Sequence, residues 1–389
     1  MSDRLRTWAE INLDNLGANF NSIRNHVGKK TKIMSVIKAD GYGHGCVQIA
    51  RKLLQCGTDY FAVACSDEAV MLRNHGITVP ILILGYIPYE AIDELIDNDI
   101  TFSVFDMEFA LLLSKRAVAK NKIAKVHIKL DTGMGRIGFL CGYNENDDKK
   151  TISDIVKIAH LEGISTEGIF THFPCADEED TDLTYNQFSL FNKVVAELEQ
   201  NGVVFSLKHC CNSAALIRFP QMHLDMVRPG IILYGCYPSE FCNNEKIKLF
   251  PVMELKTKIT HLKTLDEGHK ISYGGIYTTN KKTKIATLGI GYADGIPRSL
   301  GNQYEVLVGN EKVKIIGRIC MDQCMIDVTN VNNINVGQSV TVFGEGLPVE
   351  ICSELNGTIN YETLCNVGRR VPRVYIENGN VADVLNFLI

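Results

Sequence analysis

The first 230 residues alternate between short β-rich runs and amphipathic segments, and this alternation limits the possible folds more than any other feature. Between the runs, apolar residues recur at helical spacing; over residues 13–27, for example, Leu16, Phe20 and Ile23 lie on one side of the segment. Eight runs are strand-like, at residues 32–38, 60–65, 80–86, 101–106, 124–131, 165–173, 205–212 and 225–228. Parallel strands need crossover helices, so eight such units favour a closed (β/α)8 barrel over an open, doubly wound sheet, which remains the alternative.

Local end signals define two helices in this part of the chain. The first covers residues 46–55 and ends at Gly57, a residue typical of helix C-termini. The second covers residues 66–76, with Ser66 as its N-cap and Gly76 as its end.

After about residue 240 the pattern changes to strand-like runs separated by turn residues, at 251–265, 283–295, 304–329 and 338–344. Residues 308–311 have the composition of a hairpin connection. The predicted fold is therefore α/β, with an N-terminal (β/α)8 TIM-type barrel over residues 1–240 and a mainly β C-terminal domain over residues 241–389. The first few residues are free to join the β domain.

Composition excludes several classes of protein. A net charge of -5 gives no electrostatic reason to expect nucleic acid or an anionic membrane as a partner. No apolar run approaches the length of a membrane span, and the N-terminus lacks the basic-then-apolar order of a secretion signal, so we expect a cytoplasmic protein. The 13 cysteines are odd in number and form no CxxC pair, which indicates reduced, mostly structural thiols and no metal site.

Polar residues of reactive types follow the predicted barrel strands. Catalytic groups of such barrels lie at the carboxyl ends of the strands and in the loops that follow. These positions hold Lys38 after the first strand, Arg136 after the fifth, His172 after the sixth, Asn212 and Ser213 after the seventh, and Arg228 after the eighth. Because one face of the barrel collects all of them, we expect a site there.

Lys38 ends an apolar strand, where a charged ammonium is unfavourable unless it is paired or its pKa falls. A lowered pKa suits a lysine that forms an imine, because the neutral amine is the nucleophile. The alternative is a lysine that extends from the barrel mouth into solvent. The glycines of the next turn allow close approach of backbone to a ligand, and Tyr42 within it offers a hydroxyl to an anion.

Nine motifs, in one order along the chain, together resemble the alanine racemase family. They read VIKADGYGHG, KLDTGMGRIGF, THF, CNSAA, DMVRPGIILYG, ISYGGIYTT, GYADGIPR, GRICMDQ and YETLCNVGRRVPRVY. The resemblance implies a barrel that binds pyridoxal 5'-phosphate, followed by a β domain, which agrees with the pattern above.

By this resemblance, Lys38 forms the Schiff base with pyridoxal phosphate and is one of two acid/base groups, and Tyr273 is the other. Racemisation removes a proton from one face of Cα and returns it to the other, so two groups on opposite faces are the simpler solution. A free tyrosine has a pKa of about 10, so Tyr273 needs nearby positive charge or hydrogen bonds, with His172 and Arg228 as candidates. The alternative for Tyr273 is a half-buried strand tyrosine.

Arg228 matches the residue that contacts the pyridine nitrogen of the cofactor. Many pyridoxal enzymes have a carboxylate there, which keeps the nitrogen protonated, whereas arginine can only donate. An unprotonated ring delocalises a carbanion less, which suits a racemase. The alternative is a structural arginine paired with Asp225.

The resemblance also implies the remaining contacts. Cofactor-binding residues are Lys38, Tyr42, His172, Asn212, Ser213, Arg228, Gly230, Ile231 and Tyr361. Substrate-binding residues are Arg136, Met321, Tyr292 and Asp322. Lys129 matches a position that is carbamylated in some members, where the negative carbamate orients the arginine; an exposed strand lysine is the alternative.

The prediction is therefore a pyridoxal-phosphate-dependent alanine racemase that interconverts L- and D-alanine, supplies D-alanine for peptidoglycan and forms a homodimer with shared active sites. Tyr361 favours alanine, because related serine racemases have a smaller polar residue there. A serine or broad-specificity racemase stays the main alternative. An amino-acid decarboxylase is disfavoured by Arg228, and a non-catalytic pyridoxal-phosphate-binding protein would not need Tyr273 or Arg136.

Overall fold

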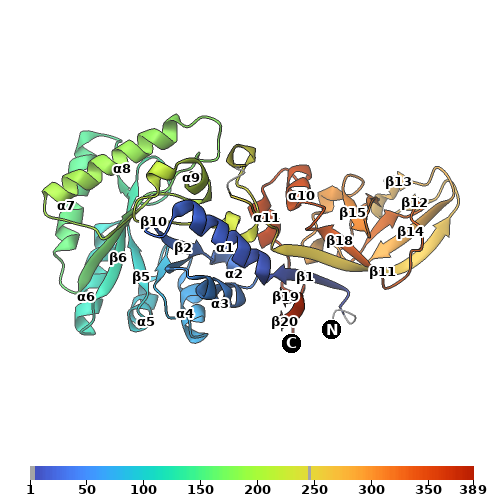
Figure 1. The fold of residues 1–389 in the computed structure, drawn as a ribbon, viewed down its shortest axis with the longest axis horizontal. Coiled ribbons are helices and arrows are strands. Elements are labelled where there is room, and N and C mark those ends of the chain that lie inside the picture. Colours follow the sequence, from blue (N-terminus) through green and yellow to red (C-terminus); the bar gives the residue numbers. More distant parts are fainter. Residues whose placement is uncertain (1–4, 244–246) are drawn as a thin grey trace. The chain divides into compact units, whose positions relative to one another are not determined.

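The computed structural model describes residues 5–243 and 247–389, which form two compact units (Figure 1). Of the described residues, 17–41, 46–243 and 247–249 form the barrel unit, and 5–16, 42–45 and 250–389 form the β unit. This division is more interleaved than the single boundary predicted after residue 240, because the N-terminal strand and a four-residue turn belong to the β unit.

Parallel strands of the barrel unit pair in the order β10-β2-β3-β4-β5-β6-β8-β9. Their bounds are β2 Lys32–Val36, β3 Tyr60–Val63, β4 Ile81–Ile83, β5 Thr101–Val104, β6 Ala124–Asp131, β8 Ile164–Phe170, β9 Leu207–His209 and β10 Met226–Val227, with β7 Phe139–Leu140 paired to β6. The ends β9 and β10 meet, since Asp225 N donates to Lys208 O at 3.1 Å and Arg228 N to Cys211 O at 3.0 Å. The predicted barrel is confirmed.

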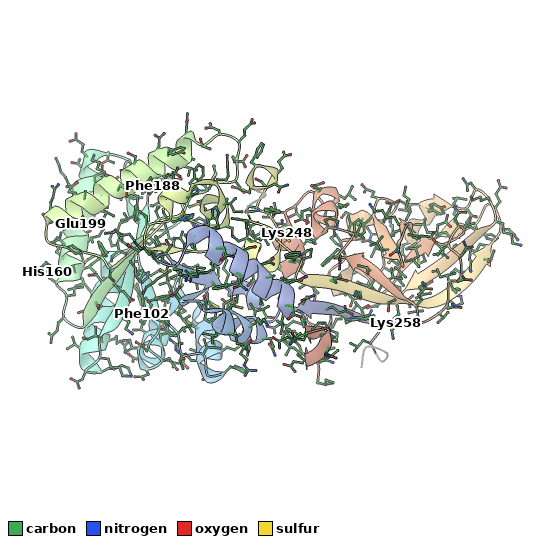
Figure 2. The ribbon with its side chains drawn as sticks, viewed as in Figure 1. Phe102, His160, Phe188, Glu199, Lys248 and Lys258 are labelled. Atoms are coloured by element: carbon green, nitrogen blue, oxygen red, sulfur yellow. The ribbon has the colours of Figure 1, made fainter. Side chains whose placement is uncertain are left out.

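Helices connect these strands, and the aliphatic and aromatic side chains between the two layers form the core. Their bounds are α1 Leu13–Val27, α2 Lys38–Tyr42, α3 Cys46–Cys56, α4 Ser66–Asn74, α5 Ile92–Asp97, α6 Met107–Ala119, α7 Glu145–Ala159, α8 Asp182–Gln200 and α9 Ser213–Arg218. Phe102 of β5 is fully buried, whereas His160 and Glu199, at the ends of α7 and α8, are exposed (Figure 2).

The predicted start of α4 is wrong by one residue. Cys65 is the extended N-cap, at φ -142°, and Ser66 is the first helical residue. The Ser66 hydroxyl is buried and makes no hydrogen bond among the described residues. The Glu68 carboxylate instead accepts from Ala64 N at 2.8 Å, just before the helix, which provides the anion that favours a helix N-terminus.

The β unit is built on one sheet with the order β14-β17-β16-β15-β18-β11-β1-β19-β20. Its elements are β1 Thr7–Asn12, β11 Met253–Leu265, β12 Lys270–Ile271, β13 Tyr277–Thr278, β14 Thr283–Leu288, β15 Glu305–Val308, β16 Glu311–Ile316, β17 Cys324–Asp327, β18 Ser339–Phe343, α10 Val349–Leu355, α11 Asn360–Cys365, β19 Arg373–Glu377 and β20 Asn380–Leu385. The hairpin at 308–311 is confirmed, with Val308 paired to Glu311 and Gly309 at φ +62°.

Two segments of the β unit that were predicted as strands are loops. Strand β14 ends at Leu288 rather than near residue 295, and β17 begins only at Cys324. The two loops, residues 289–295 and 317–323, pack backbone against backbone: a Cβ on Gly291 would lie 2.3 Å from Cys320 O and 2.4 Å from Met321 O. Such close approach requires glycine and prevents a regular strand there.

Among residues 5–243 and 247–389, no helix is both long enough and apolar enough to cross a bilayer.

Candidate active site

Lys38 follows β2 and begins a turn with an unusual backbone. Ala39, Asp40, Gly41 and Tyr42 have φ of 54°, 53°, 62° and 52°, so four successive residues are left-handed. For L-residues this conformation is unfavourable by roughly 1–2 kcal/mol each. Backbone strain of this kind is maintained only where surrounding contacts determine it, and it is common at functional sites.

Three hydrogen bonds hold this turn within the barrel unit. Gly41 N donates to Ile37 O at 2.9 Å, and Ala39 N donates to the Glu68 carboxylate at 2.6 Å. The Asp40 carboxylate accepts from Cys46 N at 2.9 Å, at the start of α3. The backbone on the C-terminal side of Lys38 is therefore fixed, and the half-buried Lys38 is attached to a rigid support.

The Arg228 guanidinium lies buried where β10 meets β9 and β8. Nη2 donates to Thr171 O at 2.8 Å and to Cys210 O at 2.9 Å, and it lies 3.5 Å from His172 Nδ1. Nη1 lies 2.9 Å from His209 Nδ1. Two carbonyl oxygens and two imidazole nitrogens therefore orient the guanidinium, which keeps its charge although it is buried.

Arginine can only donate, and this fixes the protons of two buried histidines. His209 Nδ1 must accept from Arg228, so its proton is on Nε2, which lies 2.8 Å from His127 Nδ1. His127 then accepts in turn and has its proton on Nε2, which faces the Glu167 carboxylate at 3.6 Å. The Tyr60 hydroxyl donates to the same carboxylate at 2.7 Å. A directed chain of hydrogen bonds therefore runs from Arg228 through His209 to His127, whose Nε2 faces Glu167 without a hydrogen bond among the described residues.

Several cationic side chains lie near these hydrogen-bonded residues. Burial first, and then Arg228, hold the pKa of His172 well below its ordinary value, with Arg136, Lys129 and Lys38 contributing in the same direction. Burial lowers the pKa of Lys129 to about 7, against the opposing effect of Asp131 and with the help of Arg228 and Arg136. The structure thus brings Lys38, Lys129, Arg136, His172 and Arg228 together in one region of the barrel unit.

Three alternatives from the sequence are wrong. Tyr273 lies in a short 3-10 turn, Tyr273–Gly275, and is 68 % exposed, so it is not a half-buried strand tyrosine. The Asp225 carboxylate accepts from Lys208 N at 2.8 Å rather than pairing with Arg228. Lys129 is only 2 % exposed, and its Nζ donates to Leu130 O at 2.5 Å, so it is not an exposed strand lysine.

Arg136 lies on a loop that one carboxylate organises. Asp131 Oδ1, at the end of β6, accepts from the backbone nitrogens of Gly133, Met134 and Gly135 at 3.0, 2.9 and 3.0 Å. Such a pattern determines the course of a turn without help from regular secondary structure. The exposed Arg136 follows directly after these residues.

A hydroxyl at the start of α9 accepts a hydrogen bond from the loop after β10. Ser213 Oγ accepts from Gly230 N at 2.8 Å, which leaves the hydroxyl proton of Ser213 for another acceptor. Asn212 caps α9 by accepting from Ala215 N at 2.9 Å, and its Nδ2 donates to Phe173 O at 3.1 Å. Ile231 is buried directly after Gly230.

In the β unit, Tyr42 and Tyr361 have ring centroids 6.1 Å apart. Burial raises the pKa of Tyr42, so it stays a hydroxyl donor at neutral pH. A Cβ on Gly43, at φ +80°, would lie 2.5 Å from Leu364 O, so the turn after Tyr42 requires glycine.

The other predicted residues of the β unit are exposed. Tyr273, Met321 and Tyr292 are 68 %, 53 % and 42 % exposed in the single chain. They lie on loops that are bonded to one another: Ser272 Oγ donates to Arg318 O at 2.6 Å, and Tyr292 N donates to Cys320 O at 3.0 Å.

Sequence reasoning missed His127, His209, Glu167 and Tyr60. A signal was present, because His127 alternates with Lys129 on one face of an otherwise apolar strand, and such a face lines the interior of a barrel. The contact of His127 with His209 could not be predicted from spacing, since 82 residues separate them.

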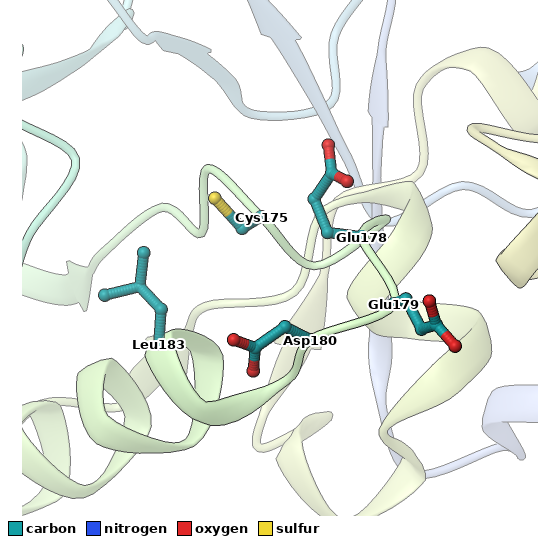
Figure 3. Close-up of a pocket in the computed structure, with 5 residues that line it drawn as sticks. All are labelled: Cys175, Glu178, Glu179, Asp180 and Leu183. Carbon is teal, nitrogen blue, oxygen red and sulfur yellow. The ribbon is translucent and has the colours of Figure 1, made fainter.

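A separate cavity of about 600 Å³ is lined by the loop that follows β8 and by the first turn of α8, through Cys175, Glu178, Glu179, Asp180 and Leu183 (Figure 3). Three consecutive carboxylates give it a negative lining, which opposes binding of a carboxylate or a phosphate. Its charge is opposite to that of the cationic region around Arg228, and we assign no role to it.

Comparison with known proteins first defines the class, that of isomerases built from a barrel followed by a β domain. The model of the N-terminal domain of alanine racemase matches residues 11–238, and that of the C-terminal domain matches residues 252–375. The chain therefore belongs to the alanine racemase family, whose members depend on pyridoxal phosphate.

Individual relatives of this chain carry the same family name. The alanine racemase of Methanococcus maripaludis is 48 % identical over 95 % of this chain and 98 % of its own. The structure of alanine racemase from Clostridium difficile 630 has a TM-score of 0.94 and 45 % identity and covers 99 % of both chains. That of alanine racemase from Bacillus anthracis with bound L-Ala-P has a TM-score of 0.90 and 37 % identity and covers 98 % of both.

Proposed function

We propose that this chain is an alanine racemase that holds pyridoxal phosphate through Lys38, interconverts L- and D-alanine, and so supplies D-alanine for peptidoglycan in the cytoplasm. The observation that carries the proposal is the buried Arg228, held by two carbonyls and a neutral imidazole in the region that also contains Lys38. Pyridoxal phosphate, when bound, supplies an electron sink for the electron pair left on the substrate Cα.

The hydrogen-bond donors of these residues suit pyridoxal phosphate. Arg228 donates and does not accept, so it suits an unprotonated pyridine nitrogen, which an aspartate or glutamate would protonate. This favours the racemase over a decarboxylase of similar architecture. For the phosphate, we assign the hydroxyls of Ser213, Tyr42 and Tyr361 and the backbone nitrogens around Gly230 and Ile231, supported by the Gly230–Ser213 bond. Asn212 and His172 stay predicted cofactor contacts.

We assign the two acid/base roles to Lys38 and Tyr273. One takes a proton from Cα while the other returns a proton to the opposite face, so the configuration inverts. Arg136 and the backbone N–H of Met321 bind the substrate carboxylate, for which arginine offers bidentate donors. Tyr292 and Asp322 stay predicted substrate contacts.

A homodimer with shared sites is the assembly that we propose. Tyr273, Tyr292 and Met321 are exposed in the single chain, as expected of residues that complete the site of a second copy. Tyr361 lies near the Tyr42 ring. By the resemblance we assign it the position beside the substrate side chain, where its ring would favour alanine over serine.

Chiral chromatography tests the reaction directly. Purified holoenzyme is incubated separately with L-alanine and L-serine. We expect D-alanine to accumulate toward an even mixture, much faster than D-serine, and to be absent with Lys38→Ala. Equal rates for both substrates would favour the broad-specificity alternative, and a folded holoenzyme that forms no D-alanine would exclude the racemase.

A further inference from the structure

Asp294 of the β unit is a fully buried carboxylate that two arginines from distant parts of the chain contact. Arg6 Nη2 and Arg370 Nε lie 2.7 and 2.8 Å from Asp294 Oδ1. Asp294 Oδ2 accepts from Gly291 N at 2.9 Å. A buried carboxylate with complete partners is strongly stabilised in one position, and removal of one partner leaves it undercompensated.

Arg370 extends this contact to the neighbouring loop. Its Nη2 lies 2.6 Å from Asp322 Oδ1 and 3.4 Å from Met321 O. One guanidinium therefore joins the loop of residues 289–295, through Asp294, to the loop of residues 317–323, through Asp322. The planar fork of arginine suits this bridge, whereas lysine offers a single point charge.

The two loops are also bonded through their backbones. Tyr292 N donates to Cys320 O at 3.0 Å, and Ala293 N donates to Met321 O at 3.0 Å. The peptide bond between Cys320 and Met321 is trans, so the Met321 N–H points opposite to the Cys320 carbonyl. The hydrogen bond from Tyr292 N to Cys320 O therefore directs the Met321 N–H away from the loop of residues 289–295.

We propose that Arg370 is a positioning residue that clamps these two loops and so holds the Met321 N–H in the direction that the substrate carboxylate requires. This inference rests on the proposed function, in which that N–H binds the carboxylate. Arg370 does not touch the substrate in this scheme. Its loss frees the loop of residues 317–323 to move, and displacement of a binding group by about 1 Å weakens a site severely.

The test compares holoenzymes of the wild type, Arg370→Gln, Arg370→Lys and the control Arg369→Gln. Arg369 is the adjacent arginine, and its guanidinium lies 5.7 Å from the Phe387 ring centroid, outside the clamp. KM and kcat for L-alanine are measured together with amide hydrogen exchange of Tyr292 and Ala293, the two donors of the loop contact, and of Cys320, which donates to Gln323 O within the loop of residues 317–323.

We expect Arg370→Gln to raise KM about tenfold while kcat changes less than about threefold, and to speed exchange at the three amides about tenfold. Arg370→Lys should recover part of both effects, and Arg369→Gln should match the wild type. Unchanged exchange would overturn the clamp, and faster exchange with unchanged KM would overturn its role in substrate binding. If the wild type forms no D-alanine, the proposed function fails, whereas the exchange result still tests the clamp.

Discussion

At the scale of single residues, Lys129 shows how burial changes chemistry. Its ammonium has little solvent around it and faces Arg136 and Arg228, so the pKa falls to about 7. The same cations that disfavour an ammonium would stabilise an anion. Attack of the neutral amine on carbon dioxide forms an N–C bond, releases one proton to solvent and leaves a carbamate of charge -1. We therefore propose that Lys129 is carbamylated.

Supply of ¹³C-bicarbonate tests this modification by NMR. The carbamate forms from the neutral amine, and with a pKa of about 7 roughly half of the amines are neutral at that pH, so the signal should rise between about pH 6 and pH 8. It should disappear in Lys129→Met and persist in Lys125→Met, a control on the same strand whose lysine pairs with Asp99 at 2.9 Å. A signal that survives in Lys129→Met would contradict the assignment.

At the scale of elements, the barrel strands are joined inside by the hydrogen bonds from Arg228 to His127, whose imidazole faces Glu167. The His127 imidazole and the Tyr60 hydroxyl lower the pKa of Glu167, so its charge stabilises the fold. Because the folded-state pKa is depressed, this stabilisation is complete above the ordinary pKa of glutamate and is lost as pH falls through the lowered value.

Replacement of Glu167 by Gln keeps the shape and removes the charge. We expect the free energy of unfolding at pH 7 to fall by about 1 kcal/mol, since the carboxylate is partly exposed and screened. The difference from the wild type should shrink as pH falls below about 4. Denaturant titrations at several pH values measure this, with Glu199→Gln as a control, because the Glu199–Lys208 pair lies on the surface at 3.2 Å. A pH-independent difference would contradict a role for the charge.

At the scale of the whole molecule, the residues predicted to act in catalysis and substrate binding are divided between two units. Lys38, Arg136 and Arg228 belong to the barrel unit, and Tyr273 and Met321 to the β unit. Since the latter two are exposed in the single chain, we propose that a second copy uses them.

Subunit mixing tests the shared site. Lys38→Ala and Tyr273→Ala chains are each expected to be inactive. After unfolding and refolding together in equal amounts, about half of the dimers should be mixed, each with one intact site, which restores about a quarter of wild-type activity. Either chain refolded alone is the control. No recovery from mixed dimers that are shown to form would contradict a contribution of Tyr273 in trans.

Local pattern in the sequence determined much of this protein. Helical periodicity placed α1 over residues 13–27, and the alternation of elements predicted the closed barrel, because both depend on neighbouring residues. The positions of Lys38, Arg136, His172 and Arg228 after strands followed from the same pattern. Their roles came from the resemblance, and those roles stay predictions.

Only the tertiary structure decided which distant residues meet. Residues 289–295 and 317–323 were predicted as strands, yet they pack as loops because Gly291 brings two backbones together. Asp294 contacts Arg6 across 288 positions of sequence, and His127 contacts His209 across 82. Such pairs depend on how the sheets close, which no local spacing encodes, and buried polar or charged groups make each of them specific once formed.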